Sequence, residues 1–141
     1  MKTFFVTGGA GFIGGNFILH LMKTNQAKII NYDKLTYAGN LDTLVSVEKN
    51  PDYTFEQGDI CDKNRLKSLF EKHEIDAVVH FAAESHVDRS IEAPGNFIQT
   101  NVVGTYELLE VTRWYWQELS AKRKNNFKFL HVSTDEVYGS L

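Results

Sequence analysis

The sequence predicts an α/β fold in which five parallel strands form a doubly wound, Rossmann-type sheet of order 3-2-1-4-5. Short apolar runs alternate with segments of helical periodicity along the whole chain. A glycine-rich turn follows the first apolar run, and the fourth run, AVVHF, is apolar almost throughout, which is typical of a parallel strand covered on both faces. At 141 residues, 43% hydrophobic and 23% charged, the chain predicts one globular domain with its own core.

Composition excludes several classes of function. The net charge of −3 gives no bulk attraction to nucleic acid or to an anionic membrane, and no apolar run approaches the roughly 18 residues of a membrane span. The first strand begins directly at the N-terminus, so we expect no signal peptide. Cys61 is the single cysteine, and the histidines show no metal-ligand spacing, so we expect no disulfide, no metal and a reducing, cytoplasmic setting.

The glycine motif TGGAGFIG lies between the strand at residues 4–6 and an apolar helical face over residues 12–23. Gly8 can adopt the positive φ of a sharp turn, Gly11 keeps side-chain atoms away from a pyrophosphate, and Gly14 allows close packing of helix on strand. The start of the helix then offers free N–H groups to an anion. The motif predicts a dinucleotide site, although a simple tight turn has the same spacing.

The second strand, at residues 28–32, ends next to Asp33. An acid at this distance from a glycine motif is typical of a ribose contact, and its charge disfavours a 2′-phosphate, so we predict NAD rather than NADP. The neighbouring Lys34 weakens this preference slightly. Asp33 could also simply turn the loop DKLTYAGN, and both roles are compatible.

The next elements are a helix at residues 41–48, stopped by the sequence NPD, and a third strand at 53–57. Asp62 is a good N-cap for a helix that carries Leu66 and Phe70. The fourth strand, at 77–81, leads into the polar loop AAESHVDRS at residues 82–90, which is a site candidate because ligands of open parallel sheets lie at such strand ends. His86 is the histidine closest to this expected site, whereas the strand histidines 80 and 131 are predicted to be satisfied in the core.

A long helical pattern covers residues 93–121 and is apolar on two sides. Its first stripe is Val102, Tyr106, Leu109 and Trp116, and its second is Leu108, Val111, Tyr115 and Leu119. One stripe can pack on the sheet, and the other predicts a partner, with the aromatic segment Trp114 to Trp116 as the interface. The alternative is a helix buried wholly in its own chain. Residues 122–126 are expected to be a solvated loop before the fifth strand at 128–132.

The last stretch, STDEVYG, places Asp135 next to Glu136 at the end of the fifth strand. Adjacent residues of a straight strand point to opposite faces, so these carboxyl groups can share a site only if the chain turns here. Two close acids tend to separate in pKa, which yields the proton donor and acceptor that a dehydration needs. The spacing from Ser133 to Glu136 is equally that of a helix capping box.

Together, TGGAGFIG, YDKLTYAGN, QGDICD, HFAAESHVDRS, QTNVVGTYELLE and VSTDEVYG resemble the extended short-chain dehydrogenase/reductase family, and the second and last motifs are specific to its sugar-nucleotide dehydratases. The resemblance implies a homodimeric lyase that uses NAD to oxidise C4 of dTDP-glucose, eliminates water across C5–C6 and returns the hydride to C6. The product would be the 4-keto-6-deoxy sugar of dTDP-rhamnose synthesis.

The resemblance also implies roles for individual residues. Asp135 would be the acid that protonates the leaving hydroxyl and Glu136 the base at C5, while Ser85 and Thr134 would contact the hexose. The cofactor residues would be the glycines together with the pyrophosphate, ribose, adenine and nicotinamide contacts: Gly8, Gly11, Phe12, Ile13, Gly14, Asp33, Lys34, Leu35, Thr36, Asp59, Ile60, Ala82, Ala83, Glu84 and Thr100.

The sequence departs from the family pattern in one important respect. The family oxidises C4 with a Tyr-x-x-x-Lys pair, and this spacing does not occur in the 141 residues. Residues 1–141 are therefore expected to be an incomplete NAD-binding domain, without the last strands and the substrate domain, and inactive alone. A noncatalytic NAD-binding module is the alternative, as is a UDP-sugar epimerase or dehydratase of the same family.

Overall fold

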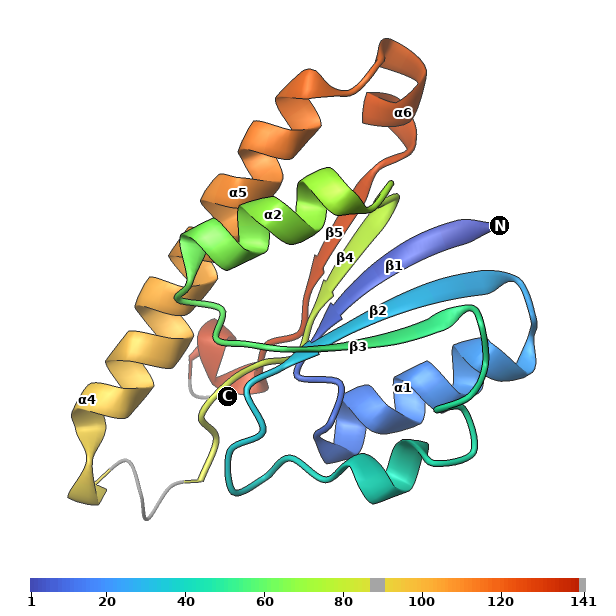
Figure 1. Ribbon diagram of the computed structural model, residues 1–141. Helices are drawn as coiled ribbons and strands as arrows, with labels where there is room; N and C mark the ends of the chain where they lie inside the picture. Colours follow the sequence, from blue (N-terminus) through green and yellow to red (C-terminus); the bar gives the residue numbers. More distant parts are fainter. Residues whose placement is uncertain (87–90, 140–141) are drawn as a thin grey trace.

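A computed structural model describes residues 1–86 and 91–139 and confirms the predicted parallel sheet of order β3-β2-β1-β4-β5 (Figure 1). All neighbouring strands pair in parallel, and Phe5 in the central strand lies between Ile30 and Val78. The strands are β1 (Lys2–Thr7), β2 (Ala27–Asp33), β3 (Tyr53–Gln57), β4 (Ala77–His80) and β5 (Lys128–His131).

Helices cover both faces of the sheet, as the doubly wound prediction requires (Figure 1). On one face, α1 (Phe12–Lys23) and η1 (Leu41–Leu44) pack over a core that includes Val6. On the other face, α2 (Lys63–Lys72) and α5 (Thr105–Glu118) enclose a core that includes Phe5. Because adjacent residues of a strand point to opposite faces, the run FFV in β1 supplies both cores.

The N-cap prediction for α2 is confirmed, whereas the predicted helix at residues 41–48 is wrong in kind and length. The Asp62 carboxylate accepts a hydrogen bond from the Arg65 N–H at 2.9 Å. At 41–48 only the short 3-10 helix η1 forms, and turns follow it. Leu44 is buried but Val45 is 61% exposed. A segment that buries so few apolar side chains gains too little to continue as an α-helix.

The predicted helix at 93–121 consists of three consecutive segments: α4 (Pro94–Phe97), the π-helix η2 (Ile98–Gly104) and α5. The stripe of Leu108, Val111 and Tyr115 is buried against the sheet, as predicted. Gly104 lies so close to Ile60 that a Cβ would stand 2.6 Å from the isoleucine Cγ1. None of the helices among the described residues is long and apolar enough to cross a membrane.

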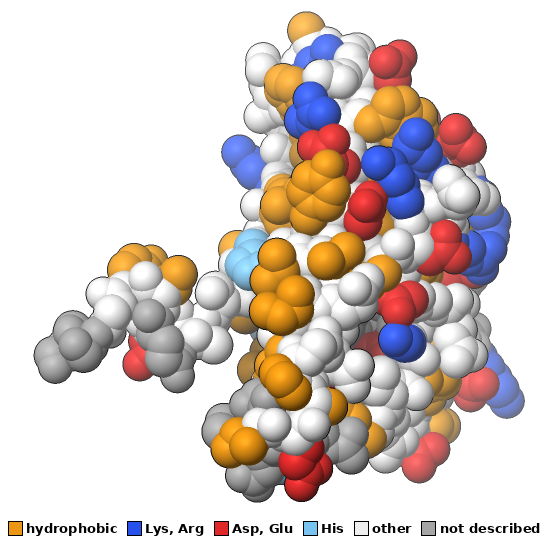
Figure 2. All heavy atoms as spheres, turned by 90° about the vertical axis from the view of Figure 1, so that its left-hand side faces the viewer, with side chains coloured by type: hydrophobic (Ala, Val, Ile, Leu, Met, Phe, Trp, Pro, Cys, Tyr) orange, Lys and Arg blue, Asp and Glu red, His pale blue; other side chains and the backbone are white. Residues whose placement is uncertain are grey.

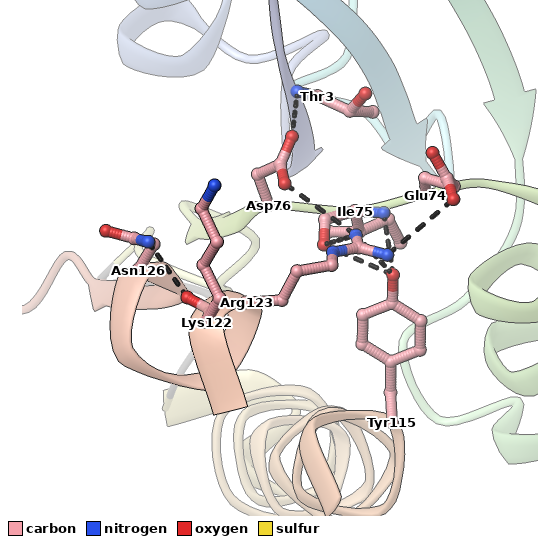
Figure 3. Close-up of polar contacts among 8 residues, drawn as sticks. All are labelled: Thr3, Glu74, Ile75, Asp76, Tyr115, Lys122, Arg123 and Asn126. Atoms are coloured by element: carbon pink, nitrogen blue, oxygen red, sulfur yellow. Dashed lines mark hydrogen bonds and ion pairs between the residues drawn. The ribbon is translucent and has the colours of Figure 1, made fainter. Parts of the chain in front are cut away.

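Residues 122–126 were predicted to form a loop, but they belong to a helix, α6 (Ala121–Asn126). Its Arg123 points from α6 toward the start of β4, where Nη2 donates to the Ile75 carbonyl at 3.1 Å and to the Tyr115 hydroxyl at 3.2 Å (Figure 3). Glu74 and Asp76 lie 3.8 and 3.7 Å from the guanidinium. This cluster fastens the end of α5 at the amino ends of the strands, opposite the predicted site.

Candidate functional site

The glycine turn lies at the carboxyl end of β1, between the loops that follow β2 and β4. Gly8 has φ +71°, as predicted, and its N–H donates to the Tyr32 carbonyl at 3.0 Å. A Cβ on Gly8 would come within 2.5 Å of the Ala82 nitrogen. The turn therefore needs glycine both for its backbone conformation and for its contact with the β4 loop.

The start of α1 is built as an exposed donor site. A Cβ on Gly14 would overlap the carbonyl oxygen of Gly8, so the helix packs directly on the turn. Gly11 occupies the N-cap, and no side chain of the described residues caps it. The side chains of Phe12 and Ile13 are 85% and 62% exposed. The N–H groups of this first turn are consequently available to an external acceptor, and an anion is the favoured one.

Asp33 ties the glycine turn to the loop after β2. Its Oδ2 accepts a hydrogen bond from the Ala10 N–H at 2.9 Å, and its Oδ1 accepts one from the Leu35 N–H at 2.8 Å. Leu35 itself has φ +58°. Of the two roles considered for Asp33, the structure contains the loop-turning one, and each carboxylate oxygen keeps a second lone pair for a hydroxyl group.

Lys34 is held by Asp59 at the end of β3. The Lys34 Nζ lies 2.7 Å from Asp59 Oδ2, and the Cys61 N–H donates to Asp59 Oδ1 at 2.9 Å. Burial alone would raise the pKa of Asp59, but the hydrogen bonds from Lys34 and Cys61 outweigh it and lower this pKa. The hydrogen bond to Asp59 raises the pKa of Lys34. Because Asp59 already pairs with Lys34, this lysine weakens the preference for NAD less than the sequence suggested.

The loop after β4 is fixed by η2. The Glu84 N–H donates to Asn101 Oδ1 and the Asn101 Nδ2 donates to the Glu84 carbonyl, both at 2.8 Å. Thr100, a predicted cofactor contact, is half-buried in the same π-helix. Ser85 and His86 are exposed, and residues 87–90 of the candidate loop lie outside the described residues.

The predicted catalytic residues lie at the end of β5, where the chain turns into the 3-10 helix η3 (Asp135–Tyr138). The turn satisfies the condition for neighbouring acids to share a site. Thr134 and Asp135 are exposed, and Asp135 makes no hydrogen bond or ion pair with the described residues. The Glu136 side chain lies outside the described part of the chain. Contact between these residues and the cofactor loops therefore stays a prediction.

Sequence reasoning missed Asn31, which supports the glycine turn from below. Its side chain is fully buried, and its Nδ2 donates to the Tyr53 hydroxyl at 2.9 Å. A Cβ on Gly9 would overlap Asn31 Oδ1, which has no hydrogen-bond partner among the described residues. The signal was an asparagine that directly follows two isoleucines in the strand KIINY, where a buried polar side chain needs an explanation.

His80 joins three elements beneath the site. Its Nδ1 lies 2.6 Å from the Thr7 hydroxyl of β1, and its Nε2 lies 2.9 Å from the Thr105 hydroxyl of α5. Burial, with a smaller contribution from His131, lowers the pKa of His80 to about 4, so the imidazole is neutral at pH 7. The core prediction is confirmed for His80 but wrong for His131, which is exposed because β5 is an edge strand of the described sheet.

Comparison with known proteins gives a consistent set of similarities. The family model described as GDP-mannose 4,6 dehydratase matches residues 5–141. A dTDP-glucose 4,6-dehydratase of Xanthomonas campestris is 60% identical over 141 residues, which are the whole of this chain and 40% of that protein. The crystal structure of dTDP-glucose 4,6-dehydratase from Bacillus anthracis, in complex with NAD, aligns with a TM-score of 0.81 and 40% identity over the whole chain and 40% of that structure. A UDP-glucose 4-epimerase from Thermotoga maritima aligns with a TM-score of 0.77 and 30% identity over 94% of this chain and 38% of that structure. The chain thus spans about 40% of the length of the relatives it matches.

Proposed function

Because the chain belongs to the GDP-mannose 4,6-dehydratase family, we propose that it forms the NAD-binding part of a dTDP-glucose 4,6-dehydratase. The observation that carries the proposal is the cradle made by Gly8, Gly14 and Asp33, in which backbone N–H groups and one carboxylate converge at the end of β1. The sequence identity of the chain is 40% to the solved dehydratase and 30% to the solved epimerase, which favours the dehydratase over the epimerase alternative.

The residues of the cradle fit a dinucleotide. Side chains at positions 8 and 14 would fill the space where the turn, the helix and the β4 loop meet. The free N–H groups of the first turn of α1 suit a pyrophosphate, and the remaining lone pairs of Asp33 suit a pair of ribose hydroxyls. In this role the bound NAD would accept a hydride from C4 of the hexose and return it to C6.

The chain's own residues would bind the sugar and move the protons. Ser85 and Thr134 would hold the hexose by hydrogen bonds. Asp135 would donate a proton to the departing C6 hydroxyl, and Glu136 would accept the C5 proton, which the C4 ketone makes acidic. The turn into η3 supports this division, because it releases the adjacent acids from the opposite directions of a strand.

Asp33 provides the test of the cofactor proposal. Asp33→Ala is expected to weaken NAD binding about tenfold, because the ribose loses its acceptor and the Ala10 N–H loses its partner. Asp33→Asn is the matched variant, since it keeps one carbonyl oxygen for the turn but loses the negative charge. Isothermal titration calorimetry with NAD measures both, and an Asp33→Ala affinity equal to that of the unmodified chain would contradict the ribose role.

We further propose a homodimer formed through the first stripe of the long helix. Hydrophobic side chains follow one another along the face on which α4, η2 and α5 lie (Figure 2). Trp114 to Trp116 was expected to form this interface, but Tyr115 is buried in the core. The exposed members are instead Ile98, Val102, Tyr106, Leu109 and Trp116, each between 41% and 59% exposed. A row of this kind on a helix face supports a partner helix.

The dimer can be tested by charge insertion. The double variant Val102→Glu, Leu109→Glu is expected to sediment as a monomer, because two carboxylates would be desolvated in each half of the interface. Val45→Glu, at an exposed valine beside η1, is the control and is expected to leave the mass unchanged. Sedimentation velocity distinguishes these outcomes, and a double variant that remains dimeric would exclude this face.

The remaining parts of the proposal rest on the resemblance and on composition. The role in dTDP-rhamnose synthesis rests on the resemblance. The single cysteine agrees with a cytoplasmic setting, and the net charge of −3 agrees with the absence of a nucleic-acid or membrane partner.

A further inference from the structure

The two loops on either side of the glycine turn touch each other across it. Because β1 lies between β2 and β4 in the sheet, the loops that follow β2 and β4 flank the carboxyl end of β1. The Tyr37 hydroxyl of the first loop donates to Glu84 Oε2 of the second at 3.3 Å. The Tyr37 ring also meets the His86 ring edge-on, with 6.3 Å between centroids. This contact therefore spans the place where the glycine turn begins.

Both ends of the contact are fastened to the framework of the site. On the Tyr37 side, the Asn40 N–H donates to the Ala10 carbonyl of the glycine turn at 2.9 Å. On the Glu84 side, the Asn101 carboxamide holds the N–H and the carbonyl of Glu84. The main chain on each side is thus fixed independently of the tyrosine, and only the side chains need to move for the contact to open.

The contact is suited to opening and closing. Tyr37 is 47% exposed, so water can replace the carboxylate as the partner of its hydroxyl. A long hydrogen bond at an exposed position contributes little to folding. Because the contact lies across the glycine turn, we expect it to affect the entry and release of a ligand bound there more than it affects folding.

We propose that Tyr37 closes over the bound dinucleotide by its contact with Glu84 and slows the release of the cofactor. The inference rests on the proposed function and concerns how the same cofactor molecule would stay bound over many turnovers. A reaction that returns its hydride to the substrate leaves the nicotinamide in its starting oxidation state. The cofactor need not exchange between turnovers, so a closure that slows both entry and exit does not limit the rate.

The test is the rate of cofactor release. The chain is loaded with NADH, mixed with a large excess of NAD in a stopped-flow fluorimeter, and the loss of bound NADH fluorescence is followed. Tyr37→Phe is expected to release NADH about fivefold faster, because only the hydrogen bond is lost, and Tyr37→Ala faster still because the ring is lost too. The thermal midpoint is expected to be the same in all three proteins.

A double-mutant cycle separates closure from other effects of the tyrosine. Glu84→Ala removes the acceptor but keeps the backbone bonds to Asn101, so Tyr37→Phe should add nothing in that background. Unchanged release in Tyr37→Phe, or an equal effect in both backgrounds, would overturn the closure. Slower release or tighter binding in Tyr37→Phe would mean that the contact obstructs the site, which also overturns it. Failure of the unmodified chain to bind NADH would refute the proposed cofactor function itself.

Discussion

Replacing Gly14 by alanine is expected to destabilise the chain by about 3 kcal/mol and to abolish measurable NAD binding. The added Cβ would overlap the Gly8 carbonyl oxygen, which is a main-chain atom that cannot rotate away. Either α1 or the turn must shift, and the Gly8 carbonyl is also the acceptor for the Gly11 N–H. Urea unfolding monitored by circular dichroism gives the change in stability, and calorimetry with NAD gives the change in affinity.

Gly95→Ala is the matched control for this substitution. Among the described residues, no atom outside the neighbouring backbone lies within 4 Å of the position that its Cβ would take, so the same chemical change is made without a clash. Its unfolding midpoint is expected to stay the same or rise slightly, because alanine favours the helical conformation. Equal midpoints for Gly14→Ala and Gly95→Ala would show that the turn and helix are not packed as described.

Acidification is expected to weaken the fold through His80 by about 3 kcal/mol between pH 6.5 and pH 4. Burial lowers the pKa of His80 from 6.5 to about 4, so the unfolded chain binds a proton in this window and the folded chain does not. The free energy of unfolding therefore rises with pH. The contribution of His80 is fully present above pH 6.5 and is lost as the pH falls toward 4. Urea titrations at a series of pH values measure the slope.

The histidine contribution is isolated by difference. His80→Gln can still donate and accept between Thr7 and Thr105 but cannot titrate, so it should lose the His80 part of the pH slope. His20→Gln, at an exposed position of α1, should keep the slope of the unmodified chain. A His80→Gln slope that is equally steep would assign the acid sensitivity to other groups.

The fold was predictable because local signals determine it. The apolar runs, the glycine turn and the Asp62 cap define the strands and helices one by one, and the alternation of strand and helix leaves few topologies. The failures occurred where tertiary contacts decide. Residues 41–48 have the apolar spacing of a helix but bury little beyond Leu44. Residues 122–126 have the polar sequence of a solvated loop, but the hydrogen bond from Arg123 to the Ile75 carbonyl holds them against the rest of the chain.

The residues of the candidate site also fall into those that a local pattern predicts and those that only tertiary contacts reveal. Gly8, Gly14 and Asp33 were predictable because backbone geometry dictates the residue type at each position. The support given by Asn31 and His80 was not, since their partners are distant in sequence and are set by strand pairing. The relation of Asp135 to the cradle follows from neither local pattern nor the described contacts.

The π-helix η2 sets a length requirement on this part of the chain. Asn101 is fixed to the β4 loop, while Leu108, Val111 and Tyr115 are fixed in the core. Removing one residue from Ile98–Gly104 would rotate everything beyond it by about 100°. Either the buried stripe of α5 would then leave the core or Asn101 would leave Glu84. Apart from Asn101 and Gly104, the residues of η2 can therefore change in sequence, but single insertions and deletions should be rare there.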